Sequence, residues 1–237
     1  MTTTIEGQPT SAKVRAILAD EGRPVLLAFS RGKDSIAAWL ALRDAGVDVI
    51  PYHMYLVPDL AFVAESLAYF ADWFGYKIHN IPHPSLYRWI GSCTFQAPER
   101  LAIIEAARLP SPEYASIIGM LRTDLGLPAD TWIADGVRAC DSPVRRLSIA
   151  RHGPMKAGSR KVSAIWDWSV AEVRERIEAA GVELPVEYEW FGRSFDGLDH
   201  RFLGPLRDHA PDDYQRVLDW FPLAELELFR REMMTCA

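Results

Sequence analysis

Short apolar, β-rich segments alternate with helix-like stretches along the first 180 residues, and this alternation limits the possible folds more than any other feature. The segments are an apolar run beginning at Pro24, "VDVIPYHMYLV" (47–57), "YKIHNIP" (76–82), "TWIADGV" (131–137) and "KVSAIWDW" (161–168). Strands that alternate with helices favour a mostly parallel sheet covered on both faces. The predicted fold class is therefore α/β, with five mostly parallel strands and helices on both faces.

The pattern of the chain changes near residue 185. Before it, apolar periodicity and stop signals predict helices over 11–21, 34–45, 61–74, 98–108, 112–126 and 169–180. After it, an aromatic, loop-rich segment precedes two helical pieces, roughly 211–220 and 223–234. We therefore predict an α/β domain over residues 1–184 and a small helical subdomain over 185–237.

Composition narrows the class of protein. The 237 residues are 49% hydrophobic, which is enough for one sizeable core. The net charge of −6 argues against broad, non-specific nucleic-acid binding, although a local basic patch is still compatible with it. Three scattered cysteines fit neither a disulfide framework nor an Fe–S cluster. No apolar run reaches the length of a membrane span, and the N-terminus lacks a secretory pattern. We predict a cytoplasmic protein without a membrane segment.

The turn "FSRGKDS" between the first strand and the next helix is the first candidate site, because ligands of open α/β sheets bind beyond the carboxyl ends of the strands. The turn contributes Ser30, Arg31, Gly32, Lys33, Asp34 and Ser35. Free N–H groups at a helix start, hydroxyl donors and two basic side chains form a cradle for phosphate or pyrophosphate. Gly32 is expected to adopt a backbone shape closed to other residues.

Asp34 stands out because a carboxylate is unexpected in an anion site. It is predicted either to cap the helix or to hold a magnesium ion that bridges phosphates. The turn is not a Walker A motif, since Leu27 and Asp34 stand where that motif needs glycine and Ser or Thr. The alternative interpretation is an ordinary strand–helix turn with capping residues.

A second cluster, "ADGVRACDSPVRR" (134–146), follows a later strand. Gly136 ends that strand, so Arg138 is expected at the same sheet edge as the first turn. Arg138, Arg145 and Arg146 are predicted to surround a second anion: a phosphate, a sulfate or a nucleic-acid backbone. The alternative is a solvated loop whose arginines pair with nearby aspartates.

These stretches resemble the PP-loop ATP pyrophosphatases, and most closely the phosphoadenosine phosphosulfate (PAPS) reductase-like family. "FSRGKDS" is similar to the family's S-G-G-K-D-S signature, with Arg31 as a replacement that resembles bacteriophage-encoded members. "HMYLVPDLAFVAESLAYFADWFG" (53–75), residues 134–146 and "KVSAIWDWSVAEV" (161–173) extend the likeness over about residues 20–180. The resemblance implies a nucleotide-binding domain of the adenine nucleotide alpha-hydrolase-like type over 1–184.

The resemblance also implies roles for individual residues. The residues expected to bind the nucleotide are Ser30, Arg31, Gly32, Lys33, Ser35, His53, Met54, Gly136, Arg138, Ser142 and Arg146. The residues expected to take part in catalysis are Lys33, Asp34, Arg138 and Arg145, with Asp34 as the magnesium ligand. In "FQAPER", Gln96, Glu99 and Arg100 are expected near the substrate. Independently of the resemblance, Trp190 and Phe191 in the Gly-rich segment "YEWFGRSFDG" are candidates to close over a substrate.

The cysteines depart from the reductase pattern. A catalytic cysteine in a Glu-Cys-Gly-type tail and the Cys-Cys…Cys-x-x-Cys ligands of an Fe–S cluster are both missing from the sequence. Cys236 lies in "MMTCA", which does not match that tail, and no basic neighbour would lower its pKa. Cys140 lies among arginines and is the more plausible reactive thiol, and the role of Cys93 is open.

The predicted function is an enzyme that binds ATP, or an adenylyl sulfate such as PAPS, with Mg²⁺. It would act at the α-phosphate, release pyrophosphate and adenylylate a second substrate in nucleic-acid or sulfur modification. The alternatives are a thiol-dependent PAPS reductase and a non-catalytic nucleotide-binding subunit of a phage DNA-modification system, in the host cytoplasm. The second substrate is unassigned, with nucleic acid or a ParB-like partner protein as candidates, and homo-oligomerisation is left open.

Overall fold

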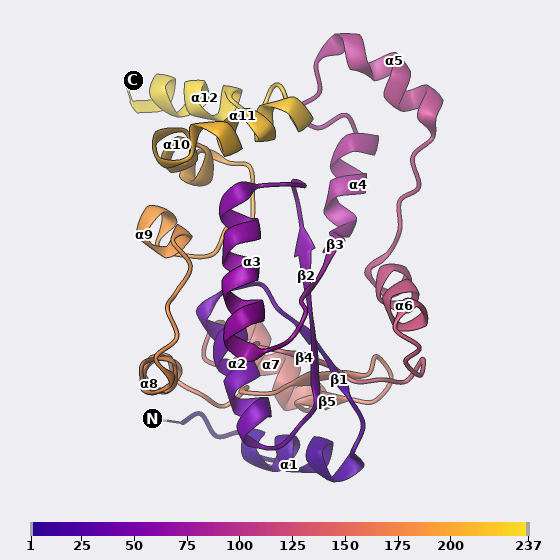
Figure 1. Ribbon diagram of the computed structural model, residues 1–237, viewed down its shortest axis with the longest axis vertical. Helices are drawn as coiled ribbons and strands as arrows, with labels where there is room; N and C mark the ends of the chain where they lie inside the picture. The colour runs from indigo at the N-terminus through magenta and orange to yellow at the C-terminus, as the bar shows by residue number, and fades with distance from the viewer. Residues whose placement is uncertain (1, 236–237) are drawn as a thin grey trace. The chain divides into compact units, whose positions relative to one another are not determined.

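The computed structural model describes residues 2–235 and contains one six-stranded sheet (Figure 1). Its strands are β1 (Val25–Ala28), β2 (Val49–Tyr55), β3 (His79–Pro82), β4 (Ile133–Asp135), β5 (Met155–Lys156) and β6 (Lys161–Ser163). Their order in the sheet is β3-β2-β1-β4-β6-β5. β1 is parallel to β2 and β4, and β4 is parallel to β6, which confirms the mostly parallel α/β prediction.

The predicted strand count of five is wrong by one. The additional strand, β5, has two residues and pairs antiparallel with β6 at the edge of the sheet. A two-residue strand carries no periodicity, which explains why the sequence pattern does not reveal it.

β1 lies in the middle of the sheet because its side chains are apolar on both faces. Val25, Leu26 and Leu27 are at most 1% exposed. The chain continues from β1 to β2 on one side and returns to β4 on the other, so the strand order reverses at β1. In open α/β sheets this reversal opens a crevice beyond the carboxyl ends of the two central strands.

The chain folds into two compact units. Unit 1 contains the residues up to His53, Ala71–His79 and Arg122–Leu184, and unit 2 contains Met54–Phe70, Asn80–Leu121 and the chain from Pro185 onward. The predicted junction after residue 184 is one of the junctions observed, and unit 2 also takes in two earlier stretches of chain. The functional assignment of the two predicted parts stays a prediction.

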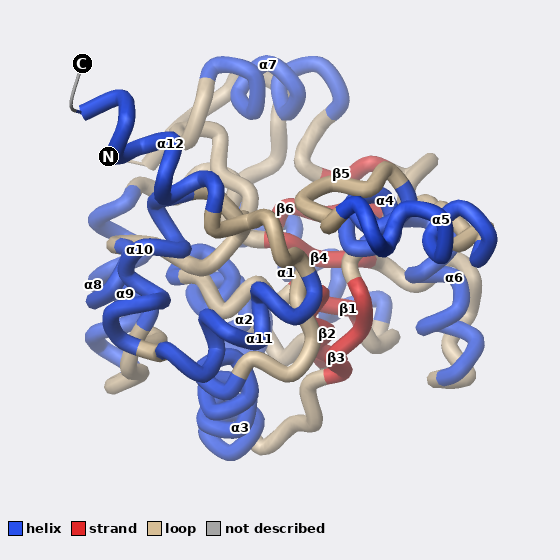
Figure 2. The backbone as a smooth tube through the Cα atoms, turned by 90° about the horizontal axis from the view of Figure 1, so that it is seen from above, coloured by secondary structure: helices blue, strands red, loops and turns tan. Residues whose placement is uncertain are grey.

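The complete helices of unit 1 are α1 (Ser11–Glu21), α2 (Lys33–Asp44), α7 (Pro143–His152) and α8 (Val170–Ala180). α2 is apolar nearly all round, as expected for a helix buried in a core. Its residues 35–42 are buried, and it packs against α8 and β4. Figure 2 shows α2 and α8 on the same side of the strands. The core therefore holds α2 rigidly behind the turn that precedes it.

Unit 2 is built mainly from helices. Those wholly within it are α4 (Pro84–Gly91), α5 (Pro98–Ala107), α9 (Glu187–Phe191), α10 (His200–His209), α11 (Pro211–Trp220) and α12 (Leu226–Thr235). α3 (Ala61–Phe74) and α6 (Tyr114–Asp124) begin in unit 2 and end in unit 1. The buried Asp213 of α11 accepts hydrogen bonds from the backbone N–H groups of Ala61 and Phe62, at 2.6 and 3.0 Å. The C-terminal helices thus cap the start of α3.

Trp190 and Phe191 pack in an aromatic cluster rather than standing open to a substrate. Trp190 stacks on the ring of His209 at 5.5 Å and meets Phe62 edge-on at 5.6 Å. Phe191 contacts Phe202 edge-on at 5.3 Å. These rings bury apolar area within unit 2, which gives both residues a packing role in place of the predicted closure.

Candidate active site

The turn between β1 and α2 has the helix start that the sequence predicts, but its backbone differs at one position. Gly32 is the N-cap of α2 with an ordinary extended φ of −73°, whereas Arg31 lies in the left-handed region with φ 64°. The expectation that Gly32 supplies the unusual conformation is therefore wrong. A left-handed residue other than glycine costs of order 1 kcal/mol, so the surrounding contacts hold Arg31 in this shape.

Hydrogen bonds within the turn fix its two serines. The Ser30 hydroxyl accepts from the Gly32 N–H at 3.3 Å and donates to the Ser35 hydroxyl at 3.2 Å. The Ser35 hydroxyl donates in turn to the Gly32 carbonyl at 2.8 Å. Ser35 is buried while Ser30 is exposed, so Ser30 is the serine that faces solvent. The turn is preorganised with the N-terminus of α2 at its end, where first-turn N–H groups favour an anion.

The side chain of Arg31 differs from the expectation of a phosphate contact at the surface. Only 1% of this residue is exposed. By contrast, the Lys33 side chain is 27% exposed, and its ammonium group contacts the Asp34 carboxylate at 2.7 Å. Lys33 is therefore the basic side chain of this turn that a ligand can reach directly.

The loop after β4 lies against the start of α2, as predicted from their parallel strands. A Cβ atom added to Gly136 would stand 2.5 Å from the backbone oxygen of Asp34 and 2.9 Å from the nitrogen of Ser35. Only glycine allows this close approach of two backbones. Gly136 therefore allows the two segments to make contact, and its predicted contact with a nucleotide stays a prediction.

Arg138 connects both segments through its guanidinium group. Its Nε lies 3.0 Å from Asp34 Oδ1 and its Nη2 lies 2.6 Å from Asp141 Oδ1, while the side chain is only 2% exposed. The Asp34 contact is an ion pair without good hydrogen-bond geometry, and Arg138 Nη1 has no hydrogen-bond partner among the described residues. A buried guanidinium N–H without an acceptor is costly, which points to an acceptor that a ligand would supply.

Asp141 links Arg138 to the surface. Its second carboxylate oxygen accepts from Arg145 Nη1 at 2.6 Å, and the Arg145 side chain is 50% exposed. Ser142 is the N-cap of α7, with its hydroxyl accepting from the Arg145 N–H at 3.2 Å. Arg146 follows on α7 and is exposed. The predicted arginine cluster is thus one buried, braced guanidinium and two exposed ones.

Asp135, at the end of β4, is a site carboxylate for which the sequence predicts no role beyond that of a counter-charge. Removal from solvent raises the pKa of Asp135, opposed by hydrogen bonds from the Val137 N–H at 3.1 Å and from the hydroxyl of Ser163. The sequence contains one signal for the role of this residue: an aspartate ends a buried strand and is followed directly by the glycine that lets two backbones come close. Its position stabilises the bend that leads into Arg138.

Asp34 has two cationic partners in the structure. Its carboxylate is already neutralised by Lys33 and Arg138. Across residues 2–235, the structure contains no group of three or more His, Cys, Asp or Glu side chains placed to hold a metal. Asp34 thus braces the two loops, and its predicted role as a magnesium ligand stays a prediction.

The segment predicted to receive adenine starts at the end of β2. His53 is buried, with its Nδ1 3.0 Å from the carbonyl of Phe29 just before the turn. Met54 is the next residue of β2 and is partly exposed. The His53 ring thus supports the turn from beneath, and the contact of both residues with a nucleotide stays a prediction.

The residues predicted near the substrate in "FQAPER" bond elsewhere within unit 2. Gln96 donates to the Trp220 carbonyl at 2.9 Å, and Arg100 donates to the Asp219 carbonyl at 2.9 Å. These bonds satisfy the C-terminal end of α11. Cys140 is exposed and its thiol donates to the Trp168 carbonyl at 3.3 Å, while Cys93 is partly buried. Cys236 lies outside the described residues.

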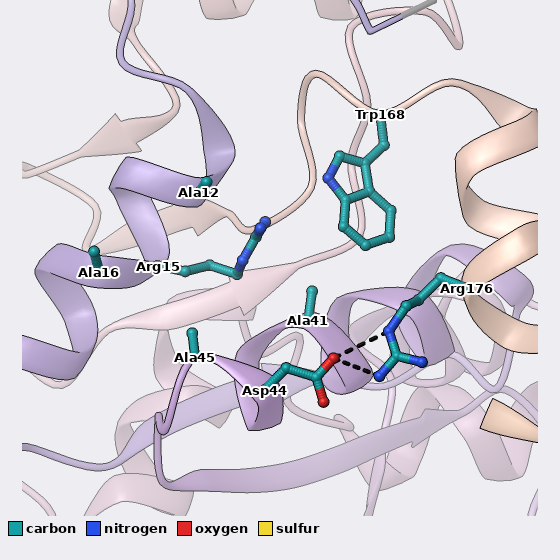
Figure 3. Close-up of a pocket in the computed structure, with 8 residues that line it drawn as sticks. All are labelled: Ala12, Arg15, Ala16, Ala41, Asp44, Ala45, Trp168 and Arg176. Atoms are coloured by element: carbon teal, nitrogen blue, oxygen red, sulfur yellow. Dashed lines mark hydrogen bonds and ion pairs between the residues drawn. The ribbon is translucent and has the colours of Figure 1, made fainter. Parts of the chain in front are cut away.

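A separate hollow of about 420 Å³ lies at the opposite end of α2 (Figure 3). Its polar groups already have partners: Arg15 donates to the Ala164 carbonyl at 2.6 Å and lies 5.5 Å from the Trp168 ring centre. Arg176 Nε donates to Asp44 at 3.0 Å. Small alanines line much of the remainder, so the hollow offers less for anion binding than the N-terminal end of α2.

None of the helices described between residues 2 and 235 is long and apolar enough to cross a membrane. The sequence matches no family model and no curated protein. Among solved structures, phosphoadenylyl-sulfate (PAPS) reductase from Candida auris, in a phosphate complex, aligns with 13% identity and a TM-score of 0.45, covering 76% of this chain and 84% of its own.

A predicted subunit of tRNA methyltransferase from Methanocaldococcus jannaschii aligns with 18% identity and a TM-score of 0.38, covering 81% of this chain and 90% of its own. At these identities and TM-scores, neither likeness assigns a family or an activity to the chain. Any functional assignment therefore rests on the residues of the site.

Proposed function

We propose that the chain binds ATP, with an adenylyl sulfate as the alternative nucleotide, and acts at the α-phosphate. The oxygen of a second substrate attacks the α-phosphorus, the bond to the β-phosphate oxygen breaks, and pyrophosphate leaves while the acceptor becomes adenylylated. The S-R-G-K-D-S turn, which resembles the PP-loop signature, supports the nucleotide assignment. The protein contributes positioning and charge neutralisation rather than a covalent intermediate.

The observation that carries the proposal is the buried Arg138 guanidinium beside the start of α2. Two carboxylates orient it, and its Nη1 lacks an acceptor among the described residues. An oxyanion that reaches Nη1 as the nucleotide or the acceptor binds would satisfy that N–H. The first turn of α2 and Lys33 would meet the departing pyrophosphate, and Arg138 would neutralise the second substrate or the transition state.

The test begins with nucleotide affinity and the Lys33→Ala variant. Loss of one charge-assisted contact, worth roughly 1.5–3 kcal/mol, should weaken ATP binding about 10- to 150-fold in calorimetry. Lys13→Ala is the matched control, because Lys13 is an exposed lysine on α1. Equal affinities for Lys33→Ala and the parent would remove the turn from the binding site.

Turnover is tested by pyrophosphate release from ATP with DNA, RNA or small acceptors present in turn. Release that depends on an acceptor and is lost in Lys33→Ala supports the enzyme. Tight ATP binding without release under any condition would instead indicate a non-catalytic nucleotide-binding subunit. Thiol-dependent reduction of PAPS that requires Cys140 would indicate a reductase.

A further inference from the structure

Positive charge is concentrated in one stretch of an acidic chain. Residues 142–166 contain six of the 26 Lys and Arg residues and no Asp or Glu, so the rest of the chain has 20 basic residues against 32 acidic ones. The six are Arg145, Arg146, Arg151, Lys156, Arg160 and Lys161. Such segregation creates a local positive field on a protein whose net charge is negative.

The structure places two of these lysines directly opposite each other. Lys156 of β5 and Lys161 of β6 are register partners in the antiparallel ladder at the edge of the sheet. Directly opposite residues lie on the same face, and like charges in this arrangement destabilise a sheet. The carboxylate of Asp135 interacts with both lysines and offsets part of this repulsion, and a bound polyanion would offset more of it.

α7 extends the same surface. Lys156 Nζ donates to the hydroxyl of Ser148 on α7 at 3.1 Å. On a helix, Arg145 and Arg151 lie one turn to either side of Ser148. Both arginines are exposed, as is Lys161. We define the basic face as Arg145, Arg151, Lys156 and Lys161. Arg160 is left out because it pairs with Asp130 at 3.0 Å and lies over the Trp132 ring.

The basic face begins at the candidate active site. Arg145 and the buried Arg138 share the carboxylate of Asp141, each at 2.6 Å. A chain of phosphates lying along α7 and β5 would therefore lead into the crevice where Arg138 lies. An acceptor with many phosphates along its length fits this geometry better than a small acceptor with one.

We infer that the basic face binds the phosphodiester backbone of a nucleic acid. The inference rests on the proposed function where it names nucleic acid as the acceptor, but binding at the face itself needs no ATP. Arginine forks and lysine ammonium groups on the face match phosphate oxygens without reading sequence. α7 exposes only two large apolar side chains, Val144 and Leu147, which is little for insertion into a lipid surface.

The experiment measures binding of a labelled 20-nucleotide single strand and a 20-base-pair duplex by fluorescence anisotropy, without ATP, between 50 and 200 mM NaCl. The variant Arg151→Gln/Lys161→Gln changes two exposed residues of the face outside the catalytic site. Its control, Lys13→Gln/Arg174→Gln, removes the same charge from exposed positions on α1 and α8.

The face variant should bind at least about tenfold more weakly at 50 mM salt, and its log–log salt slope should fall by roughly 2, whereas the control should match the parent. Equal losses in both variants, or no binding by the parent, would overturn the inference. Binding to phosphatidylserine vesicles but to neither nucleic acid would assign the face to a membrane and overturn it as well.

A second comparison separates this inference from the proposed function. Lys33→Ala should keep full nucleic-acid affinity, because Lys33 lies in the turn before α2 and outside the basic face. If nucleic acid binds and ATP does not, the face stands and the nucleotide assignment fails. A second outcome is that ATP binds and that DNA or RNA stimulates pyrophosphate release equally in the face variant and the parent. In that case the nucleotide assignment stands and the inference about the basic face is wrong.

Discussion

The turns that follow β1 and β4 both lie at the carboxyl edge of the sheet, but they prepare for an anion in different ways. The β1–α2 turn presents backbone N–H groups, a hydroxyl and the reachable Lys33, and it buries the side chain of Arg31. The β4–α7 loop buries a whole guanidinium and holds it with two carboxylates. One turn binds through a helix terminus, and the other places a rigid charge beside it.

The difference teaches that burial, rather than residue type, separates the arginines of the site. Arg138 is 2% exposed and Arg145 is 50% exposed, although both contact Asp141 at 2.6 Å. A buried ion pair that loses one partner leaves an uncompensated charge, whereas an exposed pair is largely replaced by water. The two arginines should therefore respond very differently to the same substitution.

The largest expected effect is on stability in Arg138→Met. The change leaves Asp34 and Asp141 facing a buried apolar side chain, and we expect a loss of about 3–5 kcal/mol in the free energy of unfolding by urea. Arg145→Met is the matched control and should lose about 1 kcal/mol or less. Similar losses in both variants would show that burial does not distinguish the two arginines.

The next effect concerns catalysis in Arg138→Lys, which keeps the charge but loses the planar fork. The Arg138 contacts to Asp34 and Asp141 come from two different nitrogens, Nε and Nη2, whereas a lysine has all three of its N–H donors on a single nitrogen and cannot reproduce that spread. We expect near-normal ATP affinity and pyrophosphate release slower by roughly 10²-fold in a single turnover. A sharp fall in affinity with an unchanged release rate would instead make Arg138 a ground-state binding residue.

The close approach of the two segments is tested by Gly136→Ala. The added methyl would meet the backbone of Asp34 at 2.5 Å, and a backbone cannot rotate away as a side chain can. We expect a loss of roughly 1–3 kcal/mol in unfolding free energy. Gly158→Ala is the control, since nothing lies within 4 Å of its added Cβ. Equal stability of the two variants would show that the segments do not need this contact.

Much of the fold follows from the sequence, because long, strongly periodic segments are decided locally. The helix predicted over 61–74 is observed with the same bounds, and the mostly parallel sheet follows from the strand–helix alternation. The sequence pattern misses α7, although Ser142 as N-cap and Pro143 in the first turn are helix-start signals. The charged segment after Pro143 lacks apolar periodicity, which favours the interpretation as a loop.

The sequence predicts the site in outline, but not its internal geometry. Shared strand ends predict that Arg138 and the first turn meet, since parallel strands bring their carboxyl ends to one edge. Which residue of the turn is left-handed, and which carboxylate Arg138 contacts, depend on packing between segments about a hundred residues apart. Sequence patterns describe local preference, so they assign the left-handed conformation to Gly32 rather than to Arg31.

The smallest expected effect is a change in the pH dependence of stability, and it concerns Asp135 at the end of β4. Burial raises the pKa of this carboxyl in the folded chain above its ordinary value of 3.8. The folded state therefore holds the proton more tightly, and the contribution of Asp135 to stability is complete below pH 3.8 and declines as pH rises through the folded pKa. Asp135→Asn removes this titration and retains a side-chain oxygen for the Val137 N–H. We expect Asp135→Asn to be more stable than the parent at pH 7 by a larger margin than at pH 4, as measured by urea unfolding at both pH values.

The matched change Asp141→Asn alters a carboxylate that pairs with two arginines, so this variant should lose stability at pH 7 instead. If Asp135→Asn instead loses stability relative to the parent on going from pH 4 to pH 7, the charged form of Asp135 is the stabilised one.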